Sequence, residues 1–283
     1  MFVTTSLTIN GIGFLLTAFF ETHKITDLVG ISAFLAIAFQ TLLALPPLPS
    51  NSSEESMNMM SLSALSSSSS FRIKLILLNI IVWGIRLASF LFFRVCVVGA
   101  DHRLDAFFRS PGEKYFDPKK SFFPIKLLFF WTIQSLWSII CLLPIAHLNP
   151  SSLNHPHTLN KKEASLSSLL PIFAAFLCII FESIADYQKY TFKSNPKNAK
   201  KWCNIGMFRY AQFPNYFFEI LFWTFIYISC LPFMPTVQAA FISSLSPIFV
   251  VYILTSLSGT NIRRRKRKTS FNIFLYLYSI PLT

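Results

Sequence analysis

The chain has 283 residues, of which 53% are hydrophobic and only 13% are charged. Soluble domains carry about 25% charged residues, so this composition excludes an ordinary soluble core and indicates a membrane protein. The formal net charge of +13 would suggest nucleic acid as the partner of a soluble protein. Here the basic residues stand between apolar runs, as the positive-inside rule expects, and we expect no nucleic-acid partner.

Seven apolar runs are long enough to cross a bilayer, for which about 20 mostly apolar residues are needed. Their expected spans are 3–20, 28–47, 75–98, 122–146, 168–188, 215–234 and 236–258. The sequence therefore predicts an all-α polytopic membrane protein with about seven transmembrane helices. No positively charged region precedes the first run, so we expect that run to be retained rather than cleaved as a signal peptide.

Lysine and arginine are divided unevenly between the connections. The connections after the first, third, fifth and seventh runs hold 18 of these residues. Those on the opposite side hold four, namely Arg72, Lys74, Lys161 and Lys162. Because basic connections stay in the cytosol, this asymmetry predicts an N-terminus outside the cytosol and a C-terminus inside it.

Residues that could bind a metal ion or form disulfides are sparse. The five cysteines are scattered and show no C-x-x-C spacing, so neither a disulfide framework nor a zinc site is indicated. His155 and His157 form an H-x-H pair without an evident third ligand, and we interpret them as part of a solvated loop. We expect no metal site.

One arginine lies inside the third apolar run, IVWGIRLASFLFFR. Arg86 is too far from either end of this run to reach water easily, so it needs a partner within the bundle. Glu182, Asp186 and Glu219 are the candidate counter-charges. Two interpretations of Arg86 stay open, a buried structural pair and a contact to the phosphate of a ligand.

The fifth run ends in a stripe of charged residues. Glu182, Asp186, Lys189 and Lys193 stand at positions i, i+4, i+7 and i+11, which places them on one side of a helix. For the two lysines alone, an ordinary interfacial helix end is the better interpretation. The acidic pair indicates a site, because both carboxylates fall within about one turn of the apolar run AAFLCIIFESIAD.

The sixth run begins with a polar group of its own. Pro214 suits the first turn of a helix, and Asn215 and Glu219 then share a face at i and i+4. An amide, the phenol of Tyr216 and a carboxylate at a helix entrance could recognise a polar ring or a ribose. The basic connection at 194–208 either meets anionic lipid or forms an electropositive entrance for a phosphorylated cofactor.

Several strings of the chain together resemble one family. In chain order they are VWGIRLASFLFFR, GADHRLDAFF, FWTIQSLW, ESIADYQKYTFK and NIGMFRYAQFPNYFFEILFW. From about Thr26 to Gly259 the chain resembles membrane enzymes with the C-terminal domain of steroid 5-alpha-reductases, in the branch described as DUF1295. We therefore divide the chain into an N-terminal membrane segment at 1–25, a DUF1295 membrane domain at 26–259, and a tail at 260–283 that is first basic and then apolar.

The resemblance implies an integral enzyme of the endoplasmic reticulum that passes hydride from NADPH to a carbon–carbon double bond of a lipid, often a steroid or a fatty acyl chain. The N-terminus would then be lumenal and the C-terminus cytosolic. The expected cofactor-binding residues are Glu182, Asp186, Lys189, Lys193, Gln212, Asn215 and Arg86. Tyr216 and Glu219, which belong to the same pocket, are the candidate catalytic residues and proton donors. An apolar, Phe-rich cavity would hold the lipid.

The chain departs from the family pattern at three places. Where the family usually reads S-R-H-P-N-Y-F-G-E, this chain has Ala211, Gln212 and Phe213 before Pro214, and Phe218 in place of the glycine. An arginine that could pair with phosphate and a titratable histidine are both replaced. The family's tyrosine-containing C-terminal segment is replaced by TNIRRRKRKTSFNIFLYLYSIPLT, in which Tyr276 and Tyr278 are the candidate substitutes.

Two other functions stay open alongside the reductase. One is a membrane methyltransferase that acts on a lipid or an isoprenylcysteine with S-adenosylmethionine, because such enzymes carry a similar R-H-P-x-Y motif at a helix start. The other is a non-catalytic membrane protein that keeps the fold to bind lipid, which the replaced arginine and histidine favour. The sequence predicts no particular oligomeric state.

Overall fold

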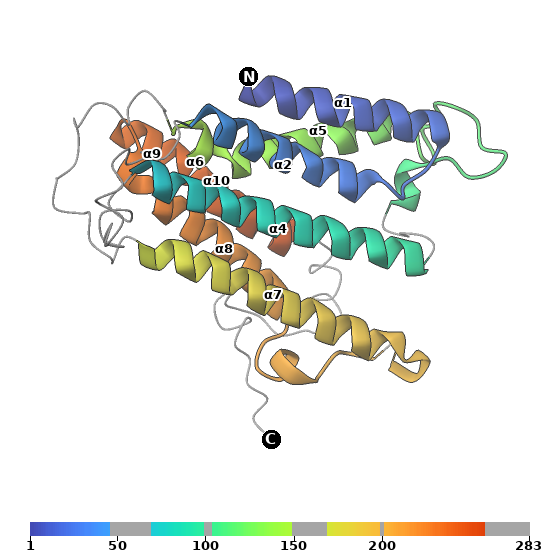
Figure 1. Cartoon of the computed structure of the whole chain (residues 1–283). Coiled ribbons are helices and arrows are strands. Elements are labelled where there is room, and N and C mark those ends of the chain that lie inside the picture. The colour runs from blue at the N-terminus through green and yellow to red at the C-terminus, as the bar shows by residue number, and fades with distance from the viewer. Residues whose placement is uncertain (46–68, 99–103, 149–168, 199–200, 258–283) are drawn as a thin grey trace, which may run out of the picture.

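The computed structural model describes residues 1–45, 69–98, 104–148, 169–198 and 201–257, and in these ranges all regular secondary structure is helical (Figure 1). The α-helices are α1 (Phe2–Phe20), α2 (Thr26–Ala44), α4 (Ser69–Val98), α5 (Ile125–Cys141), α6 (Leu143–Ala146), α7 (Leu170–Ser194), α8 (Pro214–Cys230), α9 (Val237–Ser243) and α10 (Leu245–Tyr252). Short 3-10 turns lie at Asp105–Phe107, Pro196–Asn198, Gly206–Arg209 and Leu231–Phe233. The His155–His157 pair, the basic run at 263–268, Tyr276 and Tyr278 lie outside the described residues.

The described helices form seven passes, which confirms the predicted all-α polytopic architecture. Six helical segments are long and apolar enough to cross a membrane, and the shorter apolar α5 is continued by α6 to complete the fourth pass. The seventh pass consists of α9, α10 and a π-helical turn at Ile253–Leu257. Three boundaries differ most from expectation: α4 begins at Ser69 rather than near 75, α5 begins at Ile125 rather than at 122, and α7 continues to Ser194 rather than ending at 188.

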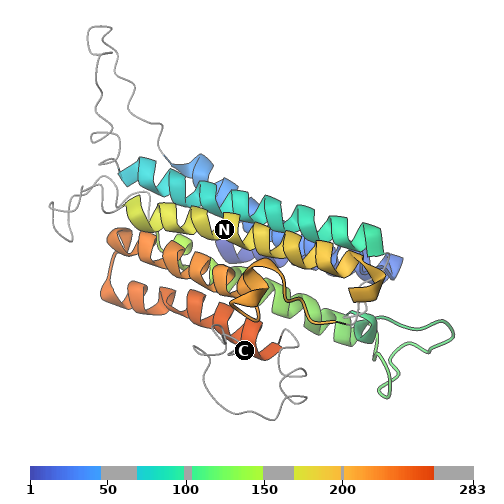
Figure 2. The same ribbon diagram turned by 90° about the horizontal axis from the view of Figure 1, so that it is seen from below.

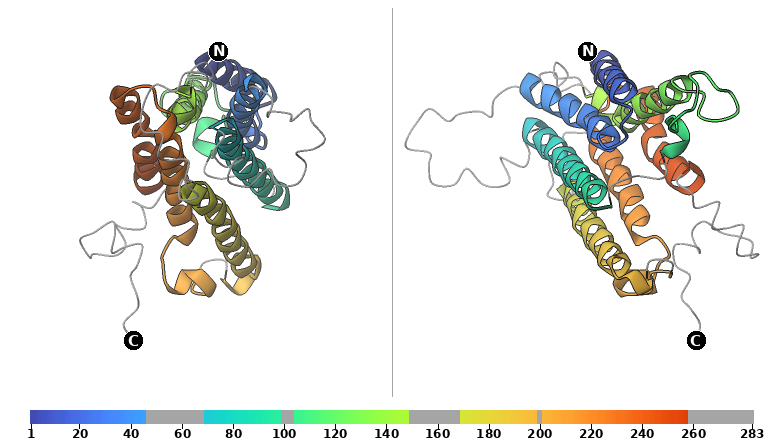
Figure 3. Two further views of the ribbon diagram at one scale, coloured as in Figure 1. Left: turned by 60° about the vertical axis from the view of Figure 1, so that its left-hand side comes forward. Right: turned by 90° about the vertical axis from the view of Figure 1, so that its right-hand side faces the viewer.

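The passes are arranged as a closed ring in which each helix packs against the next. Its order is α1, α2, α4, α7, α8, α10 and α5, and α5 returns to α1. Figure 2 shows the run of α4, α7, α8 and α10, and Figure 3 shows the ring from two further sides. The most extensive pair is α7 with α8, and α4 also contacts both of them. The two helices that carry the predicted polar groups are therefore direct neighbours.

Aromatic side chains fill the centre of this ring. Phe34 of α2, Trp83 of α4 and Trp223 of α8 are fully buried, and the ring centroids of Trp83 and Trp223 lie 5.0 Å apart in an edge-to-face arrangement. Phe222 stacks on Trp83 at 5.7 Å. Such aromatic pairs contribute about 0.5–1.5 kcal/mol each beyond their buried area. They hold α2, α4 and α8 together without polar groups.

Small and hydroxyl-bearing residues hold α1 against α5. The ring of Trp131 covers Gly13, where a Cβ atom would lie 2.4 Å from the indole. The Trp131 indole N–H donates to Thr17 Oγ1 at 2.8 Å, and the hydroxyls of Ser6 and Ser138 lie 2.6 Å apart. Close backbone approach and interhelical hydrogen bonds are the usual means of helix association in lipid, where apolar surface alone gives no driving force.

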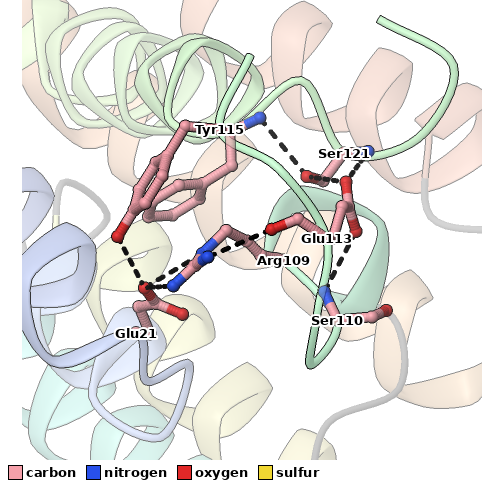
Figure 4. A network of polar contacts seen from close by, with 7 residues as sticks. Glu21, Arg109, Ser110, Glu113, Tyr115 and Ser121 are labelled. Carbon is pink, nitrogen blue, oxygen red and sulfur yellow. Dashed lines mark hydrogen bonds and ion pairs between the residues drawn. The ribbon is translucent and has the colours of Figure 1, made fainter. Parts of the chain in front are cut away.

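The described connections 21–25, 104–124, 195–198 and 201–213 lie at the same end of the bundle, which we call the basic end (Figures 1 and 2). At this end Arg109 joins two of them, because its guanidinium contacts Glu21 Oε1 at 2.6 Å (Figure 4). The Tyr115 hydroxyl donates to the same oxygen at 3.2 Å, and the Arg109 guanidinium lies 4.1 Å from the centroid of the Tyr115 ring. The hydrogen bond from Arg109 lowers the pKa of the Glu21 carboxyl. These contacts attach the end of α1 to the connection before α5.

Glu113 organises the connection itself (Figure 4). One carboxylate oxygen accepts from the Ser121 hydroxyl at 2.6 Å and from the Ser121 N–H at 3.0 Å, and the other accepts from the Ser110 N–H at 3.0 Å. The Ser121 hydroxyl, followed by the two backbone N–H groups, lowers the pKa of Glu113 to about 2. The connection is therefore a folded turn held around one ionised side chain.

The close contact between α1 and α5 predicts different effects for two glycines of the same helix. Gly13→Ala should lower the thermal unfolding midpoint of the solubilised protein, because overpacking of this kind costs about 1–3 kcal/mol. Gly11→Ala is the matched control, since no atom lies within 4 Å of its added Cβ, and it should leave the midpoint unchanged or raise it. Equal midpoints for the two variants would contradict the packing of Gly13 against Trp131.

The hydrogen bonds of Glu113 predict an acid dependence of stability. Its pKa in the folded protein lies below the usual value of about 4.3, so its carboxylate stabilises the fold fully above about pH 4.3, and this stabilisation is lost as the pH falls towards about 2. Glu113→Gln should lower the unfolding midpoint at neutral pH and flatten its decline with acid. Asp117→Asn, on the same connection, removes a carboxylate that accepts one backbone N–H and should keep the wild-type decline. The same acid dependence in wild type and Glu113→Gln would exclude this role.

Candidate functional site

The buried face of α7 changes from apolar to acidic along the helix. Its buried residues recur every three or four positions, and the series begins with Ile172 and ends with Glu182, Ala185 and Asp186. Since α7 continues to Ser194, both acids lie well inside a long helix. The sequence spacing placed Glu182 and Asp186 on one side of a helix, and in the structure this side of α7 is buried against neighbouring helices.

The connection after α7 folds back so that α8 begins beside this acidic face. The Met207 N–H donates to Gln188 Oε1 at 2.9 Å, which attaches the turn at Gly206–Arg209 to α7. Gly206 has a φ of 53°, and a Cβ atom there would lie 2.3 Å from Gln188 Oε1, so the turn requires glycine for two reasons. Pro214 then starts α8, and Asn215 in its first turn is buried against α7.

Arg86 of α4 contacts both acids of α7. Its Nη1 lies 2.6 Å from Glu182 Oε1, and its Nη2 is paired with Asp186 Oδ2. The Arg86 side chain is 14% exposed and the Glu182 side chain 2% exposed, so these ion pairs are largely removed from solvent. Arg86 thus has the counter-charges expected for a cation inside the span. Both ends of its guanidinium lie beside carboxylates, as the structural interpretation expects, although Nη1 makes no hydrogen bond among the described residues.

Two residues of α8 complete the group. Asn215 Nδ2 donates to Asp186 Oδ1 at 3.2 Å, so that Asp186 links α4 to α8. Glu219, one turn further along α8, lies within electrostatic range of Arg86, Asp186 and Glu182. Among the described residues it makes no hydrogen bond or ion pair. We call Arg86, Glu182, Asp186, Asn215 and Glu219 the carboxylate cluster.

Two acceptor atoms of this cluster have no partner within the described part of the chain. They are Glu182 Oε2 and Asn215 Oδ1, and their residues are 2% and 9% exposed. More than about 90% of buried polar groups in proteins are hydrogen-bonded, so each exception calls for an explanation. A bound group that donates hydrogen bonds would satisfy both atoms.

The other predicted site residues lie around the cluster rather than in it. Lys193 Nζ donates to the backbone carbonyls of Asn198 and Lys201, so it closes the connection after α7. Lys189 Nζ lies 6.0 Å from the centroid of the Tyr216 ring, and this ring stacks on Phe213 at 5.4 Å. Gln212 directly precedes Phe213 in the sequence and is half-buried. Its amide makes no hydrogen bond within the described ranges.

Two tryptophans near the cluster were not predicted as site residues. Trp83 precedes Arg86 by three residues, and Trp223 follows Glu219 by four, so each stands one helical turn from the cluster on its own helix. Both are fully buried, and their indole N–H groups have no hydrogen-bond acceptor among the described residues. Their helical spacing from charged residues was visible in the sequence and could have indicated them.

The ion pairs of Arg86 predict a large loss of stability when the guanidinium is removed. Arg86→Met leaves two carboxylates buried without their cation, and breaking one side of a buried ion pair costs about 3–5 kcal/mol. The unfolding midpoint in detergent should fall accordingly. Adding Glu182→Gln and Asp186→Asn to the same chain should recover most of the loss, because the two acids that contact Arg86 are then neutral. An Arg86→Met protein as stable as wild type would show that Arg86 is not the counter-charge.

Comparison with known protein families shows which family includes the helices of the carboxylate cluster. The family model described as a protein of unknown function (DUF1295) matches residues 13–275, which is nearly the whole chain. The matched region begins within α1 and includes α4, α7 and α8, the helices that carry the carboxylate cluster. No curated protein and no solved structure matches the chain. The extent of the match shows that this chain belongs to the DUF1295 family.

Proposed function

We propose that the protein is a membrane oxidoreductase that uses NADPH to reduce a carbon–carbon double bond in a lipid, such as a steroid, a sterol or a fatty acyl chain. The observation that carries this proposal is the carboxylate cluster, in which charged and amide side chains of α4, α7 and α8 meet inside an apolar bundle. Ionisable groups in such a place are costly and mark functional sites. The sequence resemblance to the steroid 5-alpha-reductase-like enzymes supplies the reaction class.

The residues present fit the proposed cofactor. Glu182 Oε2 and Asn215 Oδ1 are buried acceptors without partners, and they suit the amide N–H groups of a nicotinamide or the hydroxyls of its ribose. Lys189, which follows the two acids along α7, would meet the phosphates. Arg86 would orient Glu182 and Asp186 rather than touch the cofactor. When bound, NADPH supplies a hydride, and the chain must hold it against an apolar substrate and exclude water.

The proposed reaction also needs water to be excluded and a proton to be donated. The buried ring cluster around Trp83 and Trp223 keeps water out of the centre of the bundle. Tyr216 and Glu219 stand at the beginning of α8 and are the candidate proton donors. We place the protein in the endoplasmic reticulum membrane with its N-terminus lumenal. The basic end then faces the cytosol, where NADPH would enter.

One observation also suits the methyltransferase alternative. S-adenosylmethionine carries a sulfonium cation, and an acidic cluster would attract it as well. The two functions differ in the cofactor that binds. Purified protein in nanodiscs should therefore be tested with radiolabelled NADPH and with radiolabelled S-adenosylmethionine.

We expect NADPH to bind and S-adenosylmethionine not to bind. Asp186→Ala should abolish NADPH binding while leaving membrane insertion intact, because Asp186 joins Arg86 to Asn215. Lys197→Ala is the matched control in the exposed connection after α7, and its NADPH affinity should equal that of wild type. Unchanged affinity in Asp186→Ala would contradict the site. Folded protein that retains lipid but binds neither cofactor would favour a non-catalytic lipid binder.

A further inference from the structure

Three aromatic side chains form a row at the basic end, next to the carboxylate cluster. The rings of Tyr216 and Phe213 lie nearly parallel, with 11° between their planes and 5.4 Å between their centroids. The indole of Trp202 meets the Phe213 ring edge to face, with their centroids 5.6 Å apart. We call Trp202, Phe213 and Tyr216 the aromatic row. It connects the first turn of α8 to the described connection at 201–213.

The outer end of this row differs from the aromatic core of the bundle. Trp83 and Trp223 of the core are fully buried, whereas Trp202 is 43% exposed. Phe213 and Tyr216 are half-buried. The folded chain therefore leaves part of the Trp202 indole uncovered. Aromatic side chains with an accessible ring bind the bases of nucleotides by stacking, because every base has a π-face.

The inner end of the row lies at the residues proposed to hold the cofactor. Asn215 of the carboxylate cluster lies between Phe213 and Tyr216 in the chain, and its Oδ1 is one of the two buried acceptors without a partner. The Lys189 ammonium lies 6.0 Å from the centroid of the Tyr216 ring. The contacts therefore lead from the unpartnered acceptors past a lysine to the aromatic row. NADPH carries its nicotinamide, its phosphates and its adenine in the same order.

We propose that Trp202 stacks on the adenine ring of the cofactor and that Phe213 positions the indole for this contact. This inference rests on the proposed function, because the nicotinamide must lie at the carboxylate cluster for the adenine to reach the row. Phe213 stands where the family usually has a histidine. The ring that Trp202 contacts is therefore supplied by a residue at which this chain departs from the family pattern.

The test uses protein in nanodiscs and two fragments of the cofactor as competitors of radiolabelled NADPH. Adenosine 2′,5′-bisphosphate carries the adenine end of NADPH, and reduced nicotinamide mononucleotide carries the opposite end. Trp202→Ala should weaken the binding of NADPH and of the adenosine fragment about tenfold each, which corresponds to about 1.4 kcal/mol, because one contact between a base and an aromatic ring is lost. Binding of the mononucleotide should not change, since this fragment does not reach Trp202.

Two further variants separate stacking from other roles of the indole. Trp202→Phe keeps an aromatic ring and should recover most of the affinity for NADPH and for the adenosine fragment. Tyr210→Ala removes a 70% exposed aromatic side chain of the same connection that lies outside the row, and it should keep the wild-type affinities. The unfolding midpoint of each variant shows whether it has kept its fold. If Trp202→Ala does not fold, Phe213→Leu removes the ring that the indole contacts and provides the same comparison.

The outcomes distinguish a failure of this inference from a failure of the proposed function. If wild type and Trp202→Ala bind NADPH with equal affinity, as expected of a tryptophan that only anchors the connection at the membrane interface, the adenine site is wrong and the reductase proposal stands. An equal loss of affinity for both fragments in Trp202→Ala would also contradict the inference. If no nucleotide binds to folded wild-type protein, both proposals are wrong. A selective loss of the adenosine fragment that Trp202→Phe recovers supports the inference.

Discussion

The bundle depends on the contacts of one arginine inside the membrane-spanning region. Arg86 of α4 pairs with Glu182 and Asp186 of α7, and Asp186 accepts a hydrogen bond from Asn215 of α8. The consecutive helices α7 and α8 are thereby fixed to α4, which is far from both in the sequence, at one level of the bundle. A charged group in this environment must be paired, so the position of each of these side chains is determined by the others. Any ligand of the site would meet a group whose geometry is set before binding.

The carboxylate cluster lies between the buried aromatic core and the basic end of the bundle. On one side, Trp83 of α4 and Trp223 of α8 each lie within one turn of the cluster and belong to the buried aromatic core. Along α7, the helix continues towards the basic end, where the turn at Gly206–Arg209 is attached to Gln188. In the proposed function, the nucleotide would reach the cluster from the basic end and the lipid would meet the aromatic side. This arrangement fits a reaction between a charged nucleotide and a lipid, and the DUF1295 family match covers all the helices that form it.

Much of this fold follows from the sequence. Apolar runs of about 20 residues predict the passes, because a bilayer admits few alternatives to a helix. The need of Arg86 for a counter-charge predicted its pairing with acids across the bundle. Helical spacing placed Glu182 with Asp186, and Asn215 with Glu219, but it could not show that Lys193 turns away to loop carbonyls or that Tyr216 stacks on Phe213. Those positions depend on tertiary packing, as does the turn around Glu113, whose partners are separated from it by three and eight residues.

The central claim is that the side chains of α4, α7 and α8 form one nucleotide site that opens towards the basic end. The most direct measurement is an experimentally determined structure of the protein in nanodiscs with saturating NADP⁺. The account predicts density for the nicotinamide ring beside Glu182, Asn215 and Glu219, with the phosphates at the basic end. Density at another place, or acids that face lipid with no nucleotide near them, would contradict it.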